Sequence, residues 1–147
     1  MLVIEKAEAA TEEVVEAIAR LLPLLSQSAP APTKDEVAEI VGSPSTTLFL
    51  AREGSGGRIV GTLTLAVFRI PTAVRAWIED VIVAEEARGQ GCGEMLTMAA
   101  VEAARDAGAK TVELTSRPSR EAANRLYRRI GFVQRETNVY RYEVRPS

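Results

Sequence analysis

Apolar residues at helical spacing predict a first helix near the N-terminus. Thr11 stands just before the pattern, where an N-cap residue is expected, and Pro23 interrupts it. We therefore predict a helix from Glu12 to about Leu22. The apolar positions on its buried side are Val14, Val15, Ile18, Leu21 and Leu22.

Three later segments are predicted to be helices, and each is followed by a residue that typically ends a helix. Glycines follow each segment, at 42, 108 and 131, and glycine is the usual residue after a helix C-terminus. Their predicted bounds are Lys34–Val41, Glu94–Ala107 and Ser119–Arg129. For the segment 94–107 we expect a face that packs on a sheet, formed by Met95, Leu96, Ala99 and Ala103.

Runs rich in β-branched and apolar residues predict strands in the rest of the chain. The glycine-rich run 54–57 between two of them indicates an antiparallel hairpin. The predicted strands are Leu2–Lys6, Thr46–Arg52, Arg58–Phe68, Val74–Val83, Thr111–Ser116, Val133–Arg135 and Val139–Val144. This order indicates an α/β (α+β) fold in a single domain, 1–147. Its mixed sheet of six or seven strands is accompanied by about four helices.

Composition excludes several classes of site. The chain has 46% hydrophobic and 26% charged residues, one cysteine and no histidine. An intrachain disulfide, a His-based metal site and a Ser-His-Asp unit are therefore excluded, and we expect no metal. The apolar runs are shorter than the roughly 20 residues of a membrane helix, and the N-terminus lacks signal-peptide character. We expect a cytoplasmic protein with no membrane partner.

Charge is unevenly distributed although the net charge is only -2. Residues 1–50 carry three basic and eight acidic side chains, whereas residues 117–147 carry eight arginines and three glutamates. The acidic balance and the lack of aromatic residues among the arginines argue against nucleic acid as a partner. A small molecule that bears phosphate fits the basic segment better, and the acidic front favours cationic acceptors.

A glycine-rich turn, 88–93 (RGQGCG), lies between the apolar run 77–83 and a predicted helix. Backbone N–H groups at such a turn converge on an anion, most usefully a phosphate. The dinucleotide pattern fails because Glu94 stands where the third glycine is required. The phosphate loop of nucleoside triphosphatases fails because the turn has no lysine. The pattern Arg-x-x-Gly-x-Gly remains.

That pattern, with two further stretches, resembles the GNAT superfamily of N-acetyltransferases. The stretches are 78–83 (IEDVIV), which leads into the turn, and 122–132 (AANRLYRRIGF). The resemblance covers nearly the whole chain and implies an acyl-CoA N-acyltransferase fold with acetyl-CoA as cosubstrate. The sequence departs at Arg120, where many members carry an asparagine that contacts the pantetheine arm. Asn124 or Arg120 itself is the candidate substitute.

The resemblance also implies where acetyl-CoA binds. The pyrophosphate would lie on the backbone N–H groups of the turn, at the N-terminus of the following helix. A bulge would splay the strand 81–83, so that its backbone pairs with the pantetheine and the N–H near Ile82 polarises the thioester carbonyl. The expected binding residues are Val81, Ile82, Val83, Arg88, Gly89, Gln90, Gly91, Cys92, Gly93, Arg120, Asn124 and Tyr127.

Tyr127 and Glu79 are the candidates for proton transfer. The Tyr127 phenol suits a donor to the departing thiolate, and its alternative role is a packed tyrosine. Glu79 is a carboxylate in an apolar strand and a candidate base if burial raises its pKa; alternatively it pairs with Arg75 or another arginine. Asp80 is the second choice as base. Cys92 is interpreted as a small apolar filler rather than an activated thiolate.

Three functions are compatible with these residues. We favour an acetyl-CoA-dependent N-acetyltransferase that acts on a primary amine of a small molecule or peptide. The alternatives are a non-catalytic acyl-CoA sensor and, more distantly, another nucleotide-binding domain. The candidate acceptor pocket comprises Phe68, Arg69, Arg75, Trp77 and the loop 24–32. Family members often pair, so a homodimer is also expected.

Overall fold

The computed structural model describes residues 1–145. It divides into two compact units, and the boundary lies after Thr115. The first unit contains the sheet and three α-helices, and the second contains one α-helix followed by an extended segment. The prediction that 1–147 forms a single domain stays a prediction.

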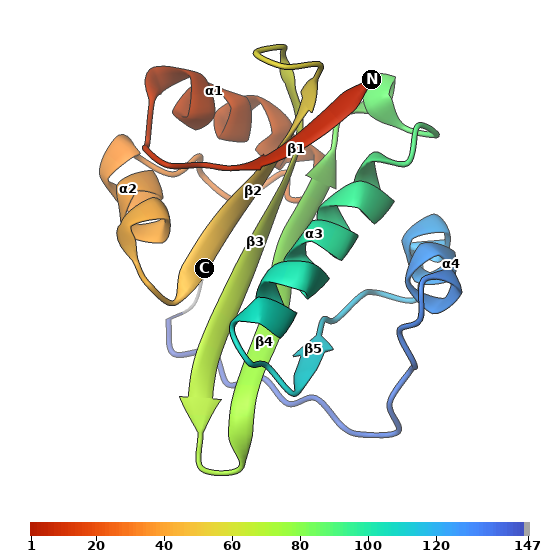
Figure 1. Ribbon diagram of the computed structural model, residues 1–147. Helices are drawn as coiled ribbons and strands as arrows, with labels where there is room; N and C mark the ends of the chain where they lie inside the picture. The colour runs from red at the N-terminus through yellow and green to blue at the C-terminus, as the bar shows by residue number, and fades with distance from the viewer. Residues whose placement is uncertain (146–147) are drawn as a thin grey trace. The chain divides into compact units, whose positions relative to one another are not determined.

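The first unit is built on a five-stranded sheet with the strand order β1-β2-β3-β4-β5 (Figure 1). The first four strands are antiparallel to their neighbours, and β5 runs parallel to β4. This confirms a mixed sheet that is antiparallel early and parallel around the glycine turn. The strands are β1 (Leu2–Lys6), β2 (Thr46–Glu53), β3 (Ile59–Ile70), β4 (Ala73–Val83) and β5 (Thr111–Glu113).

Side-chain caps fix the starts of the first two helices. In α1 (Glu12–Leu21) the Thr11 hydroxyl accepts a hydrogen bond from Val14 N–H at 3.2 Å. In α2 (Lys34–Gly42) Thr33 and Glu36 form a reciprocal capping box. A short 3-10 helix, Leu22–Leu24, carries Pro23 directly after α1. The sequence signals for these ends are confirmed to within one residue.

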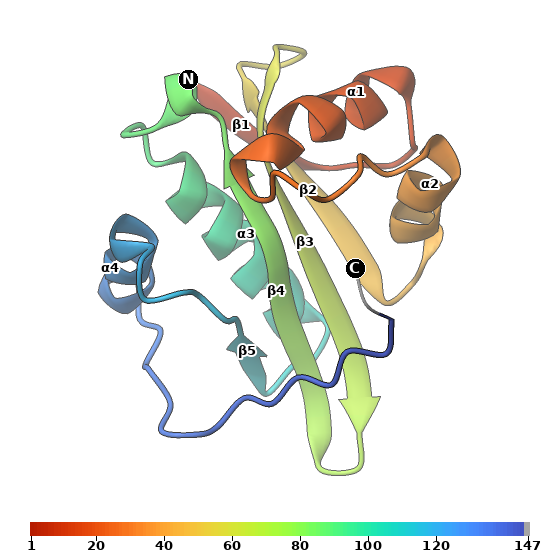
Figure 2. The same ribbon diagram turned by 180° about the vertical axis from the view of Figure 1, so that it is seen from behind.

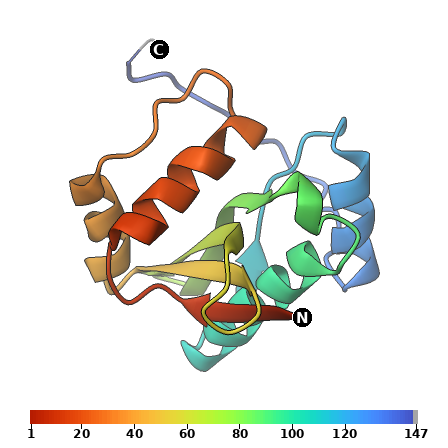
Figure 3. The ribbon, with the colours of Figure 1, turned by 90° about the horizontal axis from the view of Figure 1, so that it is seen from above.

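Helices cover the two faces of the sheet. Helix α3 (Cys92–Asp106) packs on one face, and α1 and α2 pack on the other (Figures 2 and 3). Gly61 of β3 faces α3, because a Cβ atom there would lie 2.9 Å from Cys92 Sγ. Side chains alternate along a strand, so Leu63 and Leu65 share that face and are almost completely buried.

Of the predicted core face of α3, Leu96 is confirmed, while Met95, Ala99 and Ala103 are not among the buried residues. The buried residues are Cys92, Leu96, Thr97, Ala100 and Ala104, whereas Met95 is 39% exposed. The helix also begins two residues earlier than predicted. Alanines occur on several sides of this helix, so the sequence pattern leaves its rotation weakly determined.

The strand count was also wrong at the C-terminal end. β5 stops at Glu113 instead of Ser116, and the predicted strands Val133–Arg135 and Val139–Val144 are absent from the described chain. These two segments have strand-like sequences, but a strand forms only where its backbone joins the ladder of a sheet, and neither segment is assigned to the sheet within residues 1–145. The sheet therefore has five strands rather than six or seven, within the predicted fold class.

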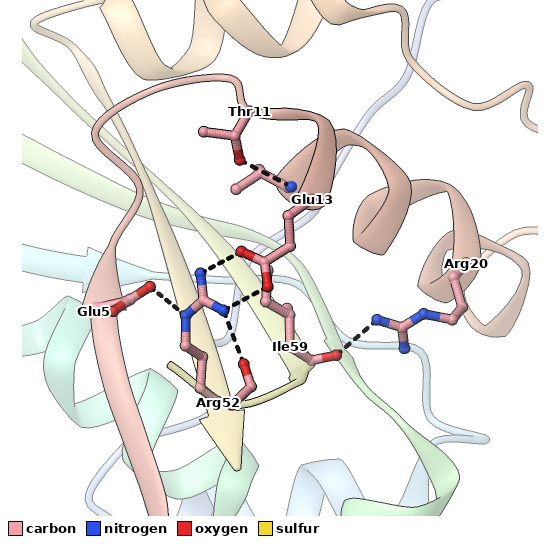
Figure 4. A network of polar contacts seen from close by, with 8 residues as sticks. Glu5, Thr11, Glu13, Arg20, Arg52 and Ile59 are labelled. Carbon is pink, nitrogen blue, oxygen red and sulfur yellow. Dashed lines mark hydrogen bonds and ion pairs between the residues drawn. The ribbon is translucent and has the colours of Figure 1, made fainter. Parts of the chain in front are cut away.

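A largely buried arginine joins α1 to the sheet (Figure 4). The Arg52 side chain on β2 is 11% exposed and holds Glu13 of α1 through two hydrogen bonds of 2.8 and 2.9 Å. It also donates to Glu5 of β1 at 2.5 Å and to the Gly57 carbonyl at 2.8 Å. The bond to Arg52 lowers the pKa of Glu13. Four chain segments are fixed together at this point.

Candidate active site

Strand β4 carries a bulge at the position that the family resemblance implies. Thr64 pairs with Glu79 and Thr62 pairs with Ile82, so β4 has one more residue than β3 across this interval. Asp80 lies in the bulge with φ +49°, the only non-glycine residue with positive φ among residues 1–145. Aspartate tolerates this left-handed conformation better than most residues.

The bulge changes which side chains of β4 share a face. Glu79 and Ile82 both lie opposite even-numbered threonines of β3, on the face away from α3. On a regular strand Glu79 would share its face with Val81 instead. The bulge therefore places the side chains of Glu79, the candidate base, and Ile82 on the same face of the sheet.

From Ile78 through the bulge to its end, β4 has an unpaired edge. Its ladder with β5 covers only Arg75 to Trp77, so from Ile78 onward no described strand pairs with β4 on that side. The backbone polar groups of 78–83 that point there are available to an extended ligand. The family resemblance implies a splayed strand over 81–83, within this unpaired edge.

The glycine turn lies between a 3-10 helix, η2 (Glu85–Ala87), and α3. Gly89 and Gly91 have φ of +78° and +81°, which L side chains rarely adopt. The turn is exposed, and no atom lies within 4 Å of the positions where their Cβ atoms would be. Hydrogen bonding in α3 begins with Met95 N–H donating to the Gly91 carbonyl. The preceding amides therefore point out of the helix end, as in an anion site.

Cys92 fills space beneath this turn. It is 2% exposed, and burial raises its pKa to about 11. A thiol with a raised pKa stays protonated at neutral pH and is a poor nucleophile. This burial agrees with the interpretation as an apolar filler, and any contribution of Cys92 to ligand binding would come from its backbone N–H.

Glu79 and Asp80 are both exposed. The burial expected to tune Glu79 as a base is therefore absent. The alternative, an ion pair with Arg75, is absent too, because Arg75 pairs with Glu113 of β5. The Arg75 guanidinium also lies 5.9 Å from the centroid of the Trp77 ring. Catalysis by Glu79 stays a prediction, and its exposed carboxylate is open to water and to an acceptor.

The second unit carries Tyr127 on helix α4 (Glu121–Arg129). Tyr127 is 7% exposed, and burial raises its pKa, while the nearby charge of Arg120 opposes the rise. The ring meets Phe132 edge to face, with 5.7 Å between the centroids. Phe132 N–H donates to the Tyr127 carbonyl across Gly131, whose φ is +117°. The phenol is therefore protonated at neutral pH.

Comparison with known protein families decides the assignment. The model of the acetyltransferase (GNAT) family matches residues 12–132. The chain belongs to the GNAT family. The matched range includes the bulge of β4, the glycine turn and Tyr127.

Individual relatives agree with this assignment. N-alpha-acetyltransferase 30 of Schizosaccharomyces pombe is 35% identical over 71 residues, which are 48% of this chain and 47% of that protein. The chain thus matches about half the length of this curated relative. The structure of a transcriptional regulator from Bacillus halodurans matches with a TM-score of 0.84 at 27% identity. The match covers 97% of this chain and 100% of that one. A Trypanosoma brucei acetyltransferase has a TM-score of 0.78 at 25% identity with the same coverage.

In this GNAT chain Asn124 has a structural role. Its side-chain NH2 group donates to the carbonyls of Arg117 and Arg120 at 2.9 and 2.8 Å. Only its carbonyl oxygen is left for a ligand, so Asn124 is a weaker substitute for the missing pantetheine contact than the sequence suggested. Arg120, the N-cap residue of α4, makes no side-chain cap bond.

Asp80 is the site residue whose special role sequence reasoning missed. The adjacent acids Glu79 and Asp80 interrupt an apolar strand, and an aspartate in such a place signals an irregular backbone. Residues 1–145 contain no cluster of three or more metal-binding side chains, and none of their helices is long and apolar enough to cross a membrane.

Proposed function

We propose that this chain transfers the acetyl group of acetyl-CoA to a primary amine by direct attack of the amine on the thioester. One observation supports the proposal: the first unit contains both an open glycine turn at the start of α3 and an unpaired edge of β4 around its bulge. The glycine turn suits a pyrophosphate, and the edge of β4 suits the amide groups of pantetheine.

The residues of the first unit fit acetyl-CoA. The amides of 89–93 would hold the pyrophosphate, with positive φ at Gly89 and Gly91 directing them outward. The backbone of Val81, Ile82 and Val83 would pair with the pantetheine arm. Acetyl-CoA supplies the activated acyl group, and the N–H near Ile82 would stabilise the charge that develops on its carbonyl oxygen. Arg88 and Gln90 are exposed and would add contacts to the phosphates.

Proton transfer is assigned to two side chains. The raised pKa keeps Tyr127 protonated and able to donate to the departing thiolate. Glu79 would accept the proton of the acceptor ammonium, through water because it is exposed. Asp80 stays the second choice, since its carboxylate is exposed beside Glu79.

The acceptor is proposed to be a cationic amine. Phe68, Arg75 and Trp77 lie with Glu79 on the sheet face away from α3, according to the strand register. This face offers an aromatic surface beside a free carboxylate. The matched region of the yeast relative belongs to a protein named for N-alpha-acetylation, which supports an amine rather than a hydroxyl acceptor.

Thiol release with acetyl-CoA and an amine panel tests the proposal. The panel should contain aminoglycosides, polyamines, amino acids and short peptides, with mass spectrometry of the amine to confirm transfer. We expect thiol release that requires both acetyl-CoA and one class of amine. Binding of acetyl-CoA without transfer to any amine would favour the sensor alternative, and stabilisation by NAD or ATP instead would favour another nucleotide-binding domain.

A further inference from the structure

Asp80 holds the backbone of β4 in a conformation that few residues adopt. The strand register leaves two residues of β4, Asp80 and Val81, opposite the single residue Leu63 of β3, and Asp80 has φ +49°. A two-against-one bulge with positive φ at its first residue is the type in which glycine usually stands. Aspartate and asparagine are the residues other than glycine that adopt positive φ most readily. Asp80 therefore takes the place of a glycine in this bulge.

Before the bulge, the directions of the backbone groups of β4 follow from its neighbours. Lys110, the residue before β5, donates its N–H to the Val74 carbonyl at 2.9 Å. Backbone groups of successive residues in a strand point to opposite edges. The even-numbered residues up to Ile78 therefore point toward the edge that carries β5, and Glu79 points toward β3.

Beyond the bulge, this alternation is reversed. Ala84 N–H donates to the Val60 carbonyl of β3 at 2.7 Å, so Ile82, two residues earlier, also points toward β3. The Ile82 carbonyl oxygen lies 3.2 Å from the Cβ position of Gly61 on β3, which agrees with that direction. Val83 therefore points its N–H and C=O toward the unpaired edge. Without the extra residue in β4, the alternation would give that place to Ile82.

We propose that Asp80 is a positioning residue, whose backbone conformation fixes the bulge and so turns the backbone groups of Val83 toward the edge that binds the acyl-CoA arm. This inference rests on the proposed function, because that function supplies the ligand of the edge. The role needs a residue that adopts positive φ at low cost. It does not need the carboxylate, which a base would need.

Substitutions at position 80 separate the backbone conformation from the carboxylate. Asp80→Asn removes the charge and keeps a side chain that tolerates positive φ, so it is the matched control. Asp80→Gly removes the whole side chain and keeps the conformation. Asp80→Val is the disruptive variant, because a β-branched residue with positive φ is a steric outlier. Asp80→Ala is a milder form of the same disruption and takes its place if the valine variant does not fold.

Calorimetry with acetyl-CoA measures the effect on the edge of β4. Asp80→Asn and Asp80→Gly should bind within about twofold of the wild-type chain, because both tolerate positive φ, whereas Asp80→Val should bind about tenfold more weakly. Equal affinity in every variant overturns the proposal, even if Asp80→Val lowers stability, since the role would then be structural only. A loss in Asp80→Asn as large as in Asp80→Val overturns it too, because the carboxylate would then be the group that matters.

Amide hydrogen exchange tests the backbone directions without any ligand. In the 15N-labelled wild-type chain, the Val83 amide should exchange at least about tenfold faster than the amides of Ile82 and Ala84, which are bonded to β3. Asp80→Asn should keep this contrast, and Asp80→Val should lose it. A Val83 amide as protected as that of Ile82 in the wild-type chain contradicts the inference.

Failure of this inference and failure of the proposed function give different results. A wild-type chain that binds no acetyl-CoA refutes the proposed function, and the exchange contrast in the Asn and Val variants then still decides the role of Asp80. A wild-type chain that binds acetyl-CoA, with the same affinity and exchange pattern in Asp80→Val, refutes the inference alone.

Discussion

Gly61 of β3 lies against the start of α3 with no room for a larger residue. A Cβ atom at this position would be 2.9 Å from Cys92 Sγ, 3.1 Å from Leu96 Cδ1 and 3.2 Å from the Ile82 carbonyl oxygen. Gly61→Ala must therefore shift the Cys92 side chain of α3 and crowd the Leu96 side chain and the backbone of β4 at Ile82. Overpacking of this kind destabilises a protein by about 1–3 kcal/mol.

A second substitution, Cys92→Ala, should relieve part of the destabilisation caused by Gly61→Ala. Cys92→Ala removes the sulfur atom that makes the shortest contact, while the contacts to Leu96 and the Ile82 carbonyl remain. Alone, Cys92→Ala should cost about 1 kcal/mol through the small cavity that it leaves. In the double variant the new methyl group occupies part of that cavity. We therefore expect its total cost to fall below the sum of the single costs by about 1 kcal/mol.

Urea unfolding followed by circular dichroism measures these free energies. Gly42→Ala is the matched control, because nothing lies within 4 Å of its Cβ position and its φ is not positive. The control should change stability by less than about 0.5 kcal/mol. Tight packing around Gly61 is refuted if Gly61→Ala lowers the free energy of unfolding no more than Gly42→Ala does. It is refuted equally if the losses caused by Gly61→Ala and Cys92→Ala are strictly additive.

Three further predictions concern the charged junction, the turn and the proposed acid. Arg52→Met should lower the free energy of unfolding by about 2 kcal/mol at neutral pH in urea titrations. Arg105→Met is the control at a surface pair, where the Arg105 side chain is 63% exposed, and it should leave stability nearly unchanged; equal effects would contradict the role of Arg52. The difference in free energy of unfolding between the wild-type chain and Arg52→Met should shrink as pH falls through the lowered pKa of Glu13, because the Glu13 carboxylate then protonates. Gly91→Ala should weaken acetyl-CoA binding about tenfold or more in calorimetry, since positive φ disfavours alanine there; unchanged affinity would exclude the turn from the site. Tyr127→Phe should lower turnover with little change in acetyl-CoA affinity, and undiminished turnover would remove Tyr127 from the mechanism.

Sequence reasoning succeeded where local chemistry decides structure. The caps at Thr11 and Thr33 and the hairpin at 54–57 appear where the sequence predicts them. Each depends on residues within a few positions along the chain, so a single sequence contains the necessary information. The glycine turn belongs to the same class, because the positive φ of Gly89 and Gly91 is a local requirement.

Errors occurred where distant contacts decide. The rotation of α3 is set by the fit of Cys92 and Leu96 against Gly61, which are far apart in the sequence. The segments 133–135 and 139–144 have strand composition, but composition does not supply a partner. The exposure of Glu79 likewise depends on which elements cover β4. A bulge that splays the strand 81–83 was inferred from family resemblance, and its place at Asp80 came only from the strand register.

The central claim is that the turn and the edge of β4 together hold acetyl-CoA, and an amide NMR titration of the 15N-labelled chain tests it most directly. We predict that acetyl-CoA shifts the amide resonances of 89–93 and 78–83 most strongly, with CoA reproducing the shifts in the turn. Absence of any shift, or shifts confined to other parts of the chain, would contradict the claim.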